Sequence, residues 1–210
     1  MDDVPETLDH FVLATPDLDA TVDDFARRTG VRPAPGGAHP GWGTRNFLVG
    51  LGGVRYLEII GPDPDQPAPG GPRLFGIDGL PEARTVTWAV RTADLDATVA
   101  RARALGHDPG EIRPMSRRTQ EGTELSWRLT AIGAAHPSGV VPFLIDWGDS
   151  PHPTSGDLPE VRLLGMEAHV PDPAELRPLL GAIGVGLDPR PGPERITFAV
   201  DTPNGEVVFD

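Results

Sequence analysis

Cysteine and lysine are both absent from this chain of 210 residues. Without cysteine there can be no disulfides, thiolate nucleophiles, iron–sulfur clusters or zinc sites built on cysteine. Without lysine there can be no Schiff-base lysine and no phosphate-binding P-loop lysine. Any chemistry must therefore come from histidine, carboxylates, arginine, hydroxyl groups or a bound ion.

Positive charge is scarce as well, and long apolar runs are missing. The chain has 18 basic residues, all arginine, against 31 acidic ones, which gives a net charge of −13. Nucleic acids and anionic membranes both need clustered positive charge, so neither is an expected partner. No apolar run approaches the roughly 20 residues that span a bilayer, and the acidic start Met1–Glu6 does not resemble a signal peptide. We therefore expect a cytoplasmic protein.

A duplicated segment is the most informative feature that the sequence does contain. The run Thr15–Val22 (TPDLDATV) returns 77 residues later as Thr92–Val99 (TADLDATV), with one letter changed. Both copies follow a short apolar stretch and open an amphipathic segment, so a strand-then-helix unit has been duplicated. A weaker third copy begins at Val170 (VPDP). We expect the paired modules to face each other, with the chemistry in the cleft between them.

The order of apolar stretches predicts an α+β fold. Three extended stretches follow each of the first two helices, which predicts two βαβββ modules. Fewer follow the third helix, which predicts a truncated βαββ unit packed on the same domain. Two modules in one chain can complete a cleft, so a monomer and a homodimer are both compatible. The predicted boundaries are residues 1–62 for the first module, 63–83 for a connection, 84–149 for the second module, 150–160 for a linker and 161–210 for the third unit.

Two ionisable side chains of interest lie in largely apolar predicted strands. His10 lies in the stretch Leu8–Ala14, and Glu58 lies in Val54–Ile60, where it shares a face with Tyr56. A carboxylate inside a sheet is costly unless it is paired, hydrogen-bonded or bound to a cation. The two residues can form a hydrogen-bonded pair, or an arginine such as Arg45 can neutralise the carboxylate. Alternatively, both can be ligands of a divalent ion whose other positions are open.

Four segments, together with these modules, resemble a known family. They are Gly36–Asn46 (GGAHPGWGTRN), Tyr56–Asp63 (YLEIIGPD), Met115–Arg118 (MSRR) and Pro142–Gly148 (PFLIDWG). Over nearly its whole length the chain resembles the glyoxalase-like domain branch of the vicinal-oxygen-chelate superfamily. The resemblance implies a lyase or isomerase acting on a small oxygenated, anionic ligand between the modules. It also implies His10 and Glu58 as catalytic residues and as ligands of one divalent ion (Zn, Ni, Mn or Fe), which would polarise vicinal oxygens while a carboxylate or imidazole moves a proton.

One feature departs from the metal-binding members of that superfamily, which usually take ligands from both modules. Aligning the repeats places Thr87 opposite His10 and Ile145 opposite Glu58, and neither is a good ligand. Asp146 is one residue away and should face the other side of its strand unless a bulge re-aims it. A third ligand can come from a histidine elsewhere: His39, His136 or His169. The departure favours an alternative function, a metal-free protein that binds or sequesters a small molecule.

Further residues are expected to line the cleft and bind the ligand. Arg117 and Arg118 can clamp a carboxylate, or they can lie at a solvated edge and balance the acidic surface. Trp127 can be part of the core or of the cleft wall. His152, between two prolines, is expected on the surface of the linker. The expected substrate-binding residues are His39, Thr44, Asn46, Arg117, Arg118 and Trp127.

Overall fold

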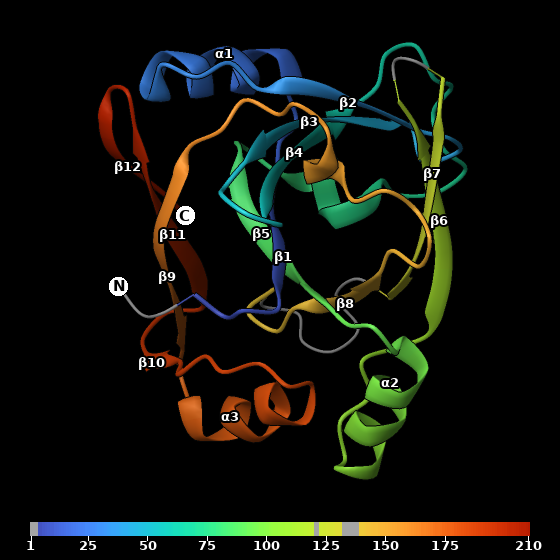
Figure 1. The fold of residues 1–210 in the computed structure, drawn as a ribbon, viewed down its shortest axis with the longest axis vertical. Coiled ribbons are helices and arrows are strands. Elements are labelled where there is room, and N and C mark those ends of the chain that lie inside the picture. The colour runs from blue at the N-terminus through green and yellow to red at the C-terminus, as the bar shows by residue number, and fades with distance from the viewer. Residues whose placement is uncertain (1–3, 120–121, 132–138) are drawn as a thin grey trace.

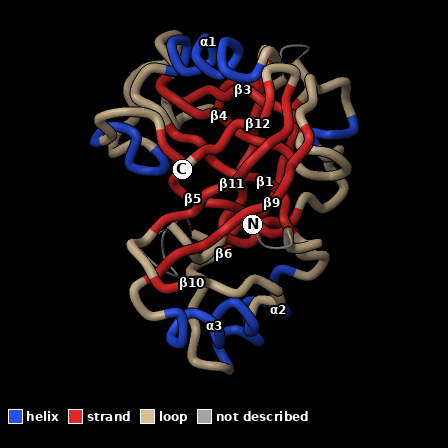
Figure 2. Tube along the Cα trace, turned by 90° about the vertical axis from the view of Figure 1, so that its left-hand side faces the viewer, coloured by secondary structure: helices blue, strands red, loops and turns tan. Residues whose placement is uncertain are grey.

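The computed structural model describes residues 4–119, 122–131 and 139–210, and it contains a closed barrel beside a second sheet (Figure 1). The α+β class predicted from the sequence is confirmed. The second sheet lies along one side of the barrel, as the tube in Figure 2 also shows. The barrel strands are β1 (Leu8–Ala14), β2 (Ala34–His39), β3 (Thr44–Gly50), β4 (Tyr56–Pro62), β5 (Arg84–Arg91), β6 (Ile112–Arg118), β7 (Glu124–Thr130) and β8 (Phe143–Asp146).

The strand order around the barrel repeats. It runs β1-β4-β3-β2 in one half and continues β6-β7-β8-β5 in the other. Within each half, the strand that comes first in the chain pairs in parallel with the strand that comes last, β1 with β4 and β5 with β8. Strands β1 and β5 are antiparallel. The halves also meet between β2 and β6, which pair at Ala38 and Arg118. The barrel is therefore built from two similar halves.

Each copy of the repeated motif opens a helix, because its aspartate caps the free N–H groups of the first turn. Asp17 accepts a hydrogen bond from the Ala20 N–H, and Asp94 accepts one from the Ala97 N–H. The third copy uses Asp172 in the same way. The helices that follow are α1 (Leu18–Thr29), α2 (Leu95–Ala104) and α3 (Pro173–Ala182).

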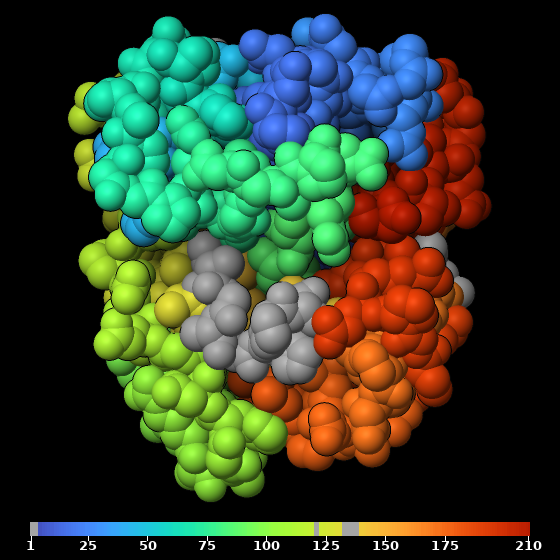
Figure 3. Space-filling model, turned by 180° about the vertical axis from the view of Figure 1, so that it is seen from behind, coloured from blue at the N-terminus to red at the C-terminus, as the bar shows by residue number. Residues whose placement is uncertain are grey.

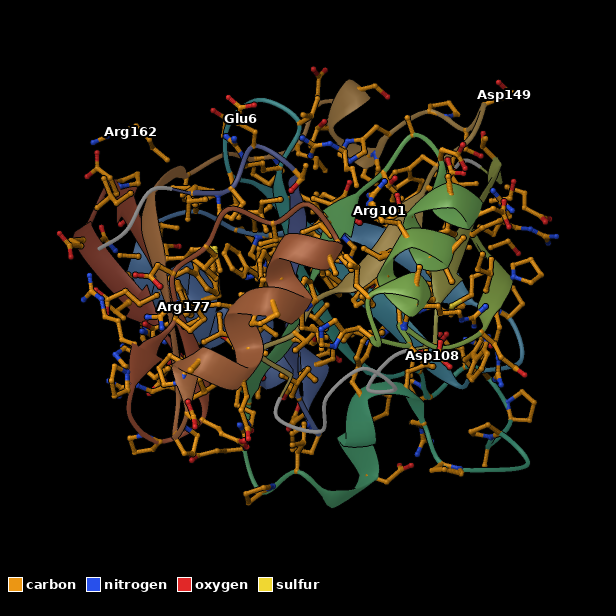
Figure 4. The ribbon with its side chains drawn as sticks, turned by 90° about the horizontal axis from the view of Figure 1, so that it is seen from below. Glu6, Arg101, Asp108, Asp149, Arg162 and Arg177 are labelled. Atoms are coloured by element: carbon orange, nitrogen blue, oxygen red, sulfur yellow. The ribbon has the colours of Figure 1, made fainter. Side chains whose placement is uncertain are left out.

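The third unit differs from the βαββ order expected for it. It contains β9 (Arg162–Val170), α3, β10 (Arg190–Pro191), β11 (Arg195–Thr202) and β12 (Gly205–Phe209), in the sheet order β10-β9-β11-β12. The additional strand β10 has two residues and lies in a segment rich in proline and glycine, which is why no strand pattern marks it. Helices α2 and α3 contact each other, and Arg101 on α2 donates to the carbonyl of Ala182 (Figure 4).

Apolar side chains form two cores. One fills the barrel interior and includes Val12, Ile60 and Ile145. The other lies between the barrel wall, the helices and the second sheet, and there Phe11 stacks on Phe198 with ring centroids 4.2 Å apart. Within the described residues, no helix is both long enough and apolar enough to cross a membrane.

Two short 3₁₀ helices lie at opposite ends of the barrel (Figures 1 and 4). The first, η1 (Leu74–Gly79), belongs to the connection between the halves, which Figure 3 shows in teal and green on the molecular surface. The second, η2 (Pro153–Ser155), belongs to the segment that leads from the barrel to the second sheet. Side chains of these two segments cover the ends of the barrel interior.

Candidate functional site

The barrel interior contains a narrow, partly open pocket with a cavity volume of about 30 Å³. Its apolar wall comes from both halves of the barrel and from η1, and it includes Phe75, Trp127, Phe143, Ile145 and Trp147. The polar lining is small and almost entirely buried. It consists of His10, His39, Asn46, Tyr56, Glu58 and Arg117.

Strand alternation explains why Glu58 lies in this pocket. Along β4, Tyr56, Glu58 and Ile60 all line the pocket, while Leu57 and Ile59 pack into the outer core. This is the period of two that a strand imposes on its side chains. The shared face of Glu58 and Tyr56 agrees with the expectation from the sequence.

The Glu58 carboxylate lies between two imidazoles. The amide Nδ2 of Asn46 donates to its Oε1 over 2.6 Å, and Nε2 of His39 is 3.8 Å from the same oxygen. Nε2 of His10 is 3.9 Å from the other oxygen, Oε2. Arg45, the alternative partner considered for Glu58, instead pairs with Asp19 on α1 at 2.8 Å. At 3.9 Å no hydrogen bond joins Glu58 to His10, so the hydrogen-bonded pair considered from the sequence is not formed, and Oε2 is the carboxylate oxygen nearer to His10.

His39, Thr44 and Asn46 form a chain of polar contacts behind Glu58. Nδ1 of His39 lies 3.1 Å from the Thr44 hydroxyl, and its Nε2 lies 3.5 Å from the Asn46 amide nitrogen. Burial lowers the pKa of His39 below its usual value, although the charge of Glu58 opposes the shift. Thr44 is fully buried and reaches the site through His39, so the structure places it behind the pocket wall.

The two arginines of β6 point to opposite sides. Arg117 lines the pocket, is 5% exposed and donates to the carbonyl of Gly36. Arg118 is exposed and lies 4.0 Å from Glu124 on the neighbouring strand. Because consecutive strand residues alternate, these two side chains cannot clamp one ligand together. The structure brings Arg117 to the site and leaves Arg118 outside it.

Aromatic rings form much of the wall. Trp127 and Trp147 lie with centroids 5.0 Å apart, and Phe143 meets the edge of His10 at 5.5 Å. Tyr56 stacks on His10 with centroids 4.6 Å apart. Burial raises the pKa of Tyr56 well above 10, and the charges of Asp9 and Glu58 add to that shift, so the phenol keeps its proton. Trp127 is thus part of the pocket wall.

A second buried carboxylate, Asp9, was missed in the sequence analysis. Its Oδ1 lies 2.7 Å from Nδ1 of His10. Its Oδ2 lies 3.2 Å from Nε2 of His152 and 3.3 Å from the indole nitrogen of Trp147. His152, expected on the surface of the linker, is instead only partly exposed and reaches the barrel. The available signal was an acidic residue directly before His10 in an apolar stretch.

The metal ion implied by the family resemblance has His10 and Glu58 as its candidate ligands. Ile145 faces them without a donor atom, and His39 approaches the oxygen of Glu58 that lies away from His10. Across residues 4–119, 122–131 and 139–210, no three His, Asp or Glu side chains are close enough to hold a metal ion. Catalytic zinc usually has three protein ligands. The described residues therefore do not fit a metal site.

The other residues considered as ligands lie elsewhere. Thr87 pairs with Val12 in the barrel wall and is not among the lining residues. Asp146 accepts a hydrogen bond from Arg128 at 3.1 Å. His169 is on β9 of the second sheet, 3.9 Å from Glu167. His136 lies outside the described residues.

Comparison with known proteins gives a family and a set of solved structures. The family model described as "Glyoxalase-like domain" matches residues 8–184. The comparison with curated proteins gave no match. A hypothetical protein from Staphylococcus aureus is 14% identical and has a TM-score of 0.62, with 96% of this chain and 84% of that one covered. This likeness shows the fold.

Two epimerase structures are less similar in shape. Methylmalonyl-CoA epimerase from Mycobacterium tuberculosis is 20% identical with a TM-score of 0.44, and the match covers 74% of this chain and 96% of that one. The Streptomyces coelicolor enzyme of the same name is 24% identical with a TM-score of 0.44, and the match covers 71% and 100%.

Proposed function

Because the chain belongs to the family of proteins with a glyoxalase-like domain, we propose that it is an enzyme that moves a proton on a small oxygenated organic acid in the barrel pocket. The two halves of the barrel act as duplicated βαβββ modules whose shared interior holds the ligand. Among lyase and isomerase reactions, the site fits those that take a proton from carbon and return it.

Glu58 is the proposed base. Asn46 donates to Oε1, so Oε2 is the oxygen that is directed toward His10 and the pocket. With a 2-oxo acid bound, Oε2 takes the proton from the carbon next to the carbonyl group. The electron pair of that C–H bond forms a carbon–carbon double bond, while the π pair of the carbonyl group moves onto its oxygen and gives an enolate. Return of the proton to the opposite face of a chiral carbon re-forms the carbonyl group and inverts that carbon, which is an isomerisation.

Arg117 and His10 supply the remaining roles. The buried guanidinium of Arg117 attracts the ligand carboxylate and the developing enolate, and burial strengthens this attraction relative to water. Nε2 of His10, next to Glu58 Oε2, provides a second acid–base group. The aromatic wall excludes water and contacts the carbon skeleton of the ligand.

One observation carries this proposal: a carboxylate, an imidazole and a guanidinium, all nearly buried, line a narrow and largely apolar pocket inside the barrel. Ionisable groups in such surroundings are typical of functional sites. A protein that only binds its ligand is the second candidate, and the lack of a third metal ligand is the observation that favours it.

Deuterium exchange tests the reaction directly. 2-Oxobutyrate and phenylpyruvate are incubated with the protein in D₂O, and the loss of their C3 protons is followed by proton NMR against a protein-free sample. We expect faster exchange with the protein, and a fall of about 100-fold or more in the Glu58→Gln variant. The matched control is Glu124→Gln, because Glu124 is exposed on the barrel wall.

Each other outcome has a defined meaning. A rise in melting temperature with either acid but no faster exchange favours the binding protein. Exchange that is equally fast in Glu58→Gln overturns the role of that carboxylate. If the two acids neither bind nor exchange, the proposed ligand class is overturned.

The divalent ion implied by the resemblance is tested in the same assay. We expect protein purified without an affinity tag and dialysed against EDTA to retain its exchange rate. A loss that Zn, Ni, Mn or Fe restores, and that the His10→Ala variant cannot recover, would establish the metal mechanism instead.

A further inference from the structure

We propose that Asp9, held by His152 and Trp147, is a positioning residue that keeps His10 in the tautomer whose bare Nε2 faces Glu58. The consequence for turnover rests on the proposed function, since it requires His10 to act on the ligand. The tautomer itself does not depend on any substrate.

A β-bulge in β1 makes the contact possible. Leu8 pairs with Val90 and His10 pairs with Ala89, so Asp9 is an extra residue between two consecutive partners on β5. In a regular strand the side chains of Asp9 and His10 would point to opposite faces. A bulge disrupts that alternation and can re-aim a side chain. Here the Asp9 carboxylate reaches the Nδ1 atom of its own neighbour.

The hydrogen bonds around Asp9 determine where the protons lie. Nδ1 of His152 accepts from the backbone N–H of Thr154 and lies 2.7 Å from the Thr154 hydroxyl, which can also donate to it. Because the Asp9 carboxylate only accepts, the proton of a neutral His152 is on Nε2, 3.2 Å from Oδ2. That N–H donates to Asp9 Oδ2, as does the indole N–H of Trp147. Oδ1 then accepts from Nδ1–H of His10, which leaves the lone pair of His10 on Nε2.

Charge supports the same role. The Asp9 side chain is fully buried, and besides its contacts with His10, His152 and Trp147 its Oδ2 lies 3.9 Å from Nη1 of Arg91. These neighbours favour the charged carboxylate, which balances the positive charge that appears when His10 accepts a proton. An apolar residue would fill the same space without the cost of burying a charge. Packing therefore does not explain the Asp9 carboxylate, whereas orientation of His10 does.

The segment between the barrel and the second sheet thus takes part in the site. His152 lies directly before η2, and its ring also meets Tyr56 at 5.6 Å and Trp147 at 5.4 Å. The same segment is anchored where the Gly50 N–H donates to the carbonyl of Pro159 at 2.8 Å. His152, expected at the surface, is in this way held against the Asp9 carboxylate that orients His10.

The test is nitrogen-15 NMR of the full chain with labelled histidine, at a pH where the imidazoles are neutral. In the wild-type protein we expect His10 to carry its proton on Nδ1. In Asp9→Asn, the amide oxygen should turn to the two donors, His152 and Trp147. Its NH₂ group then faces Nδ1 of His10 and moves the proton of that ring to Nε2.

Deuterium exchange of 2-oxobutyrate provides the functional readout. We expect Asp9→Asn to slow it by about 100-fold or more, as a wrong tautomer does in other histidine-dependent enzymes. The matched control is Asp23→Asn, because Asp23 is exposed on α1 and pairs with Arg32. It should leave both the tautomer and the exchange rate unchanged.

Two results would overturn the inference, and both differ from a failure of the proposed function. Nε2–H on His10 of the wild-type protein would overturn it even if Asp9→Asn did not fold. An unchanged tautomer or an unchanged exchange rate in a folded Asp9→Asn protein would do the same. Exchange that is insensitive to Glu58→Gln would instead reject the proposed reaction while the tautomer of His10 stays as expected.

Discussion

At the scale of single residues, the site is governed by how two buried carboxylates are satisfied. Asp9 has a nitrogen donor from a side chain on each oxygen, so it is suited to hold its surroundings in place. Glu58 accepts a hydrogen bond from Asn46 on Oε1, so Oε2 is the oxygen suited to accept a proton. A carboxylate thus has a structural role in Asp9 and a proposed chemical role in Glu58, on the neighbouring strand.

The low pKa of Asp9 predicts a loss of stability in acid. Its value of about 2 in the folded protein lies below the ordinary 3.8, so the stabilisation is complete above pH 3.8 and is lost as the pH falls toward 2. The difference corresponds to about 2 kcal/mol. We expect the free energy of unfolding in urea to fall by about that much more in the wild-type protein than in Asp9→Asn between pH 5 and pH 2. Equal losses in the two proteins would contradict the shift.

At the scale of secondary-structure elements, the seam between β2 and β6 joins the two halves at the polar side of the pocket. The halves pair there at Ala38 and Arg118, and Arg117 donates to Gly36 across the same seam. Gly37 permits this approach: a Cβ atom on it would lie 2.0 Å from the carbonyl oxygen of Arg118. The position of Arg117 in the pocket therefore depends on a close contact between two backbones.

Gly37→Ala should open this seam. The variant combines an unfavourable positive φ with a clash against backbone, whereas Gly41→Ala has a positive φ and open space around the new methyl group. We expect Gly37→Ala to lower the free energy of unfolding by about 2 kcal/mol more than Gly41→Ala, because overpacking against rigid atoms costs about 1–3 kcal/mol. Urea unfolding measures the difference. Equal destabilisation of the two variants would show that the seam tolerates the added methyl group.

At the scale of the whole molecule, the barrel and the second sheet share a core. Phe11 of β1 and Phe198 of β11 are fully buried and stacked, and they belong to one apolar cluster that also includes α1 and α3 residues. The neighbouring residues of β1, Asp9 and His10, belong to the site. Loss of the second sheet would therefore expose the outer face of the strand that carries both groups.

Phe198→Ala should destabilise both parts together. Truncation of a buried phenylalanine costs about 3–5 kcal/mol. All four tryptophans lie between residues 42 and 147, in the barrel or its loops, so their fluorescence reports on the barrel, with Trp88 in the core shared with the second sheet. We expect the fluorescence midpoint and the circular dichroism midpoint to fall together, with little change in Val208→Ala, a half-exposed position on β12. Separate transitions for the two signals would show that the parts unfold independently.

Features that depend on neighbours along the chain can be predicted from the amino-acid sequence. The aspartate of each repeat caps a helix through the N–H of a residue two or three positions later, so the motif identifies the helix starts directly. The period of two along β4 places Glu58 and Tyr56 on one face. The family resemblance, confirmed by the match over residues 8–184, added the expectation of a ligand pocket.

Contacts between groups that are far apart in the chain depend on the three-dimensional packing. The bulge at Asp9 arises from the register between β1 and β5, and no local pattern in either strand encodes that register. His152 reaches Asp9 because of the path of an irregular segment, which has no periodicity to interpret. Arg117 faces inward and Arg118 outward because of how β6 meets β2 in the closed barrel. Contacts between residues far apart in the chain depend on how complete elements pack, and composition and spacing do not record that packing.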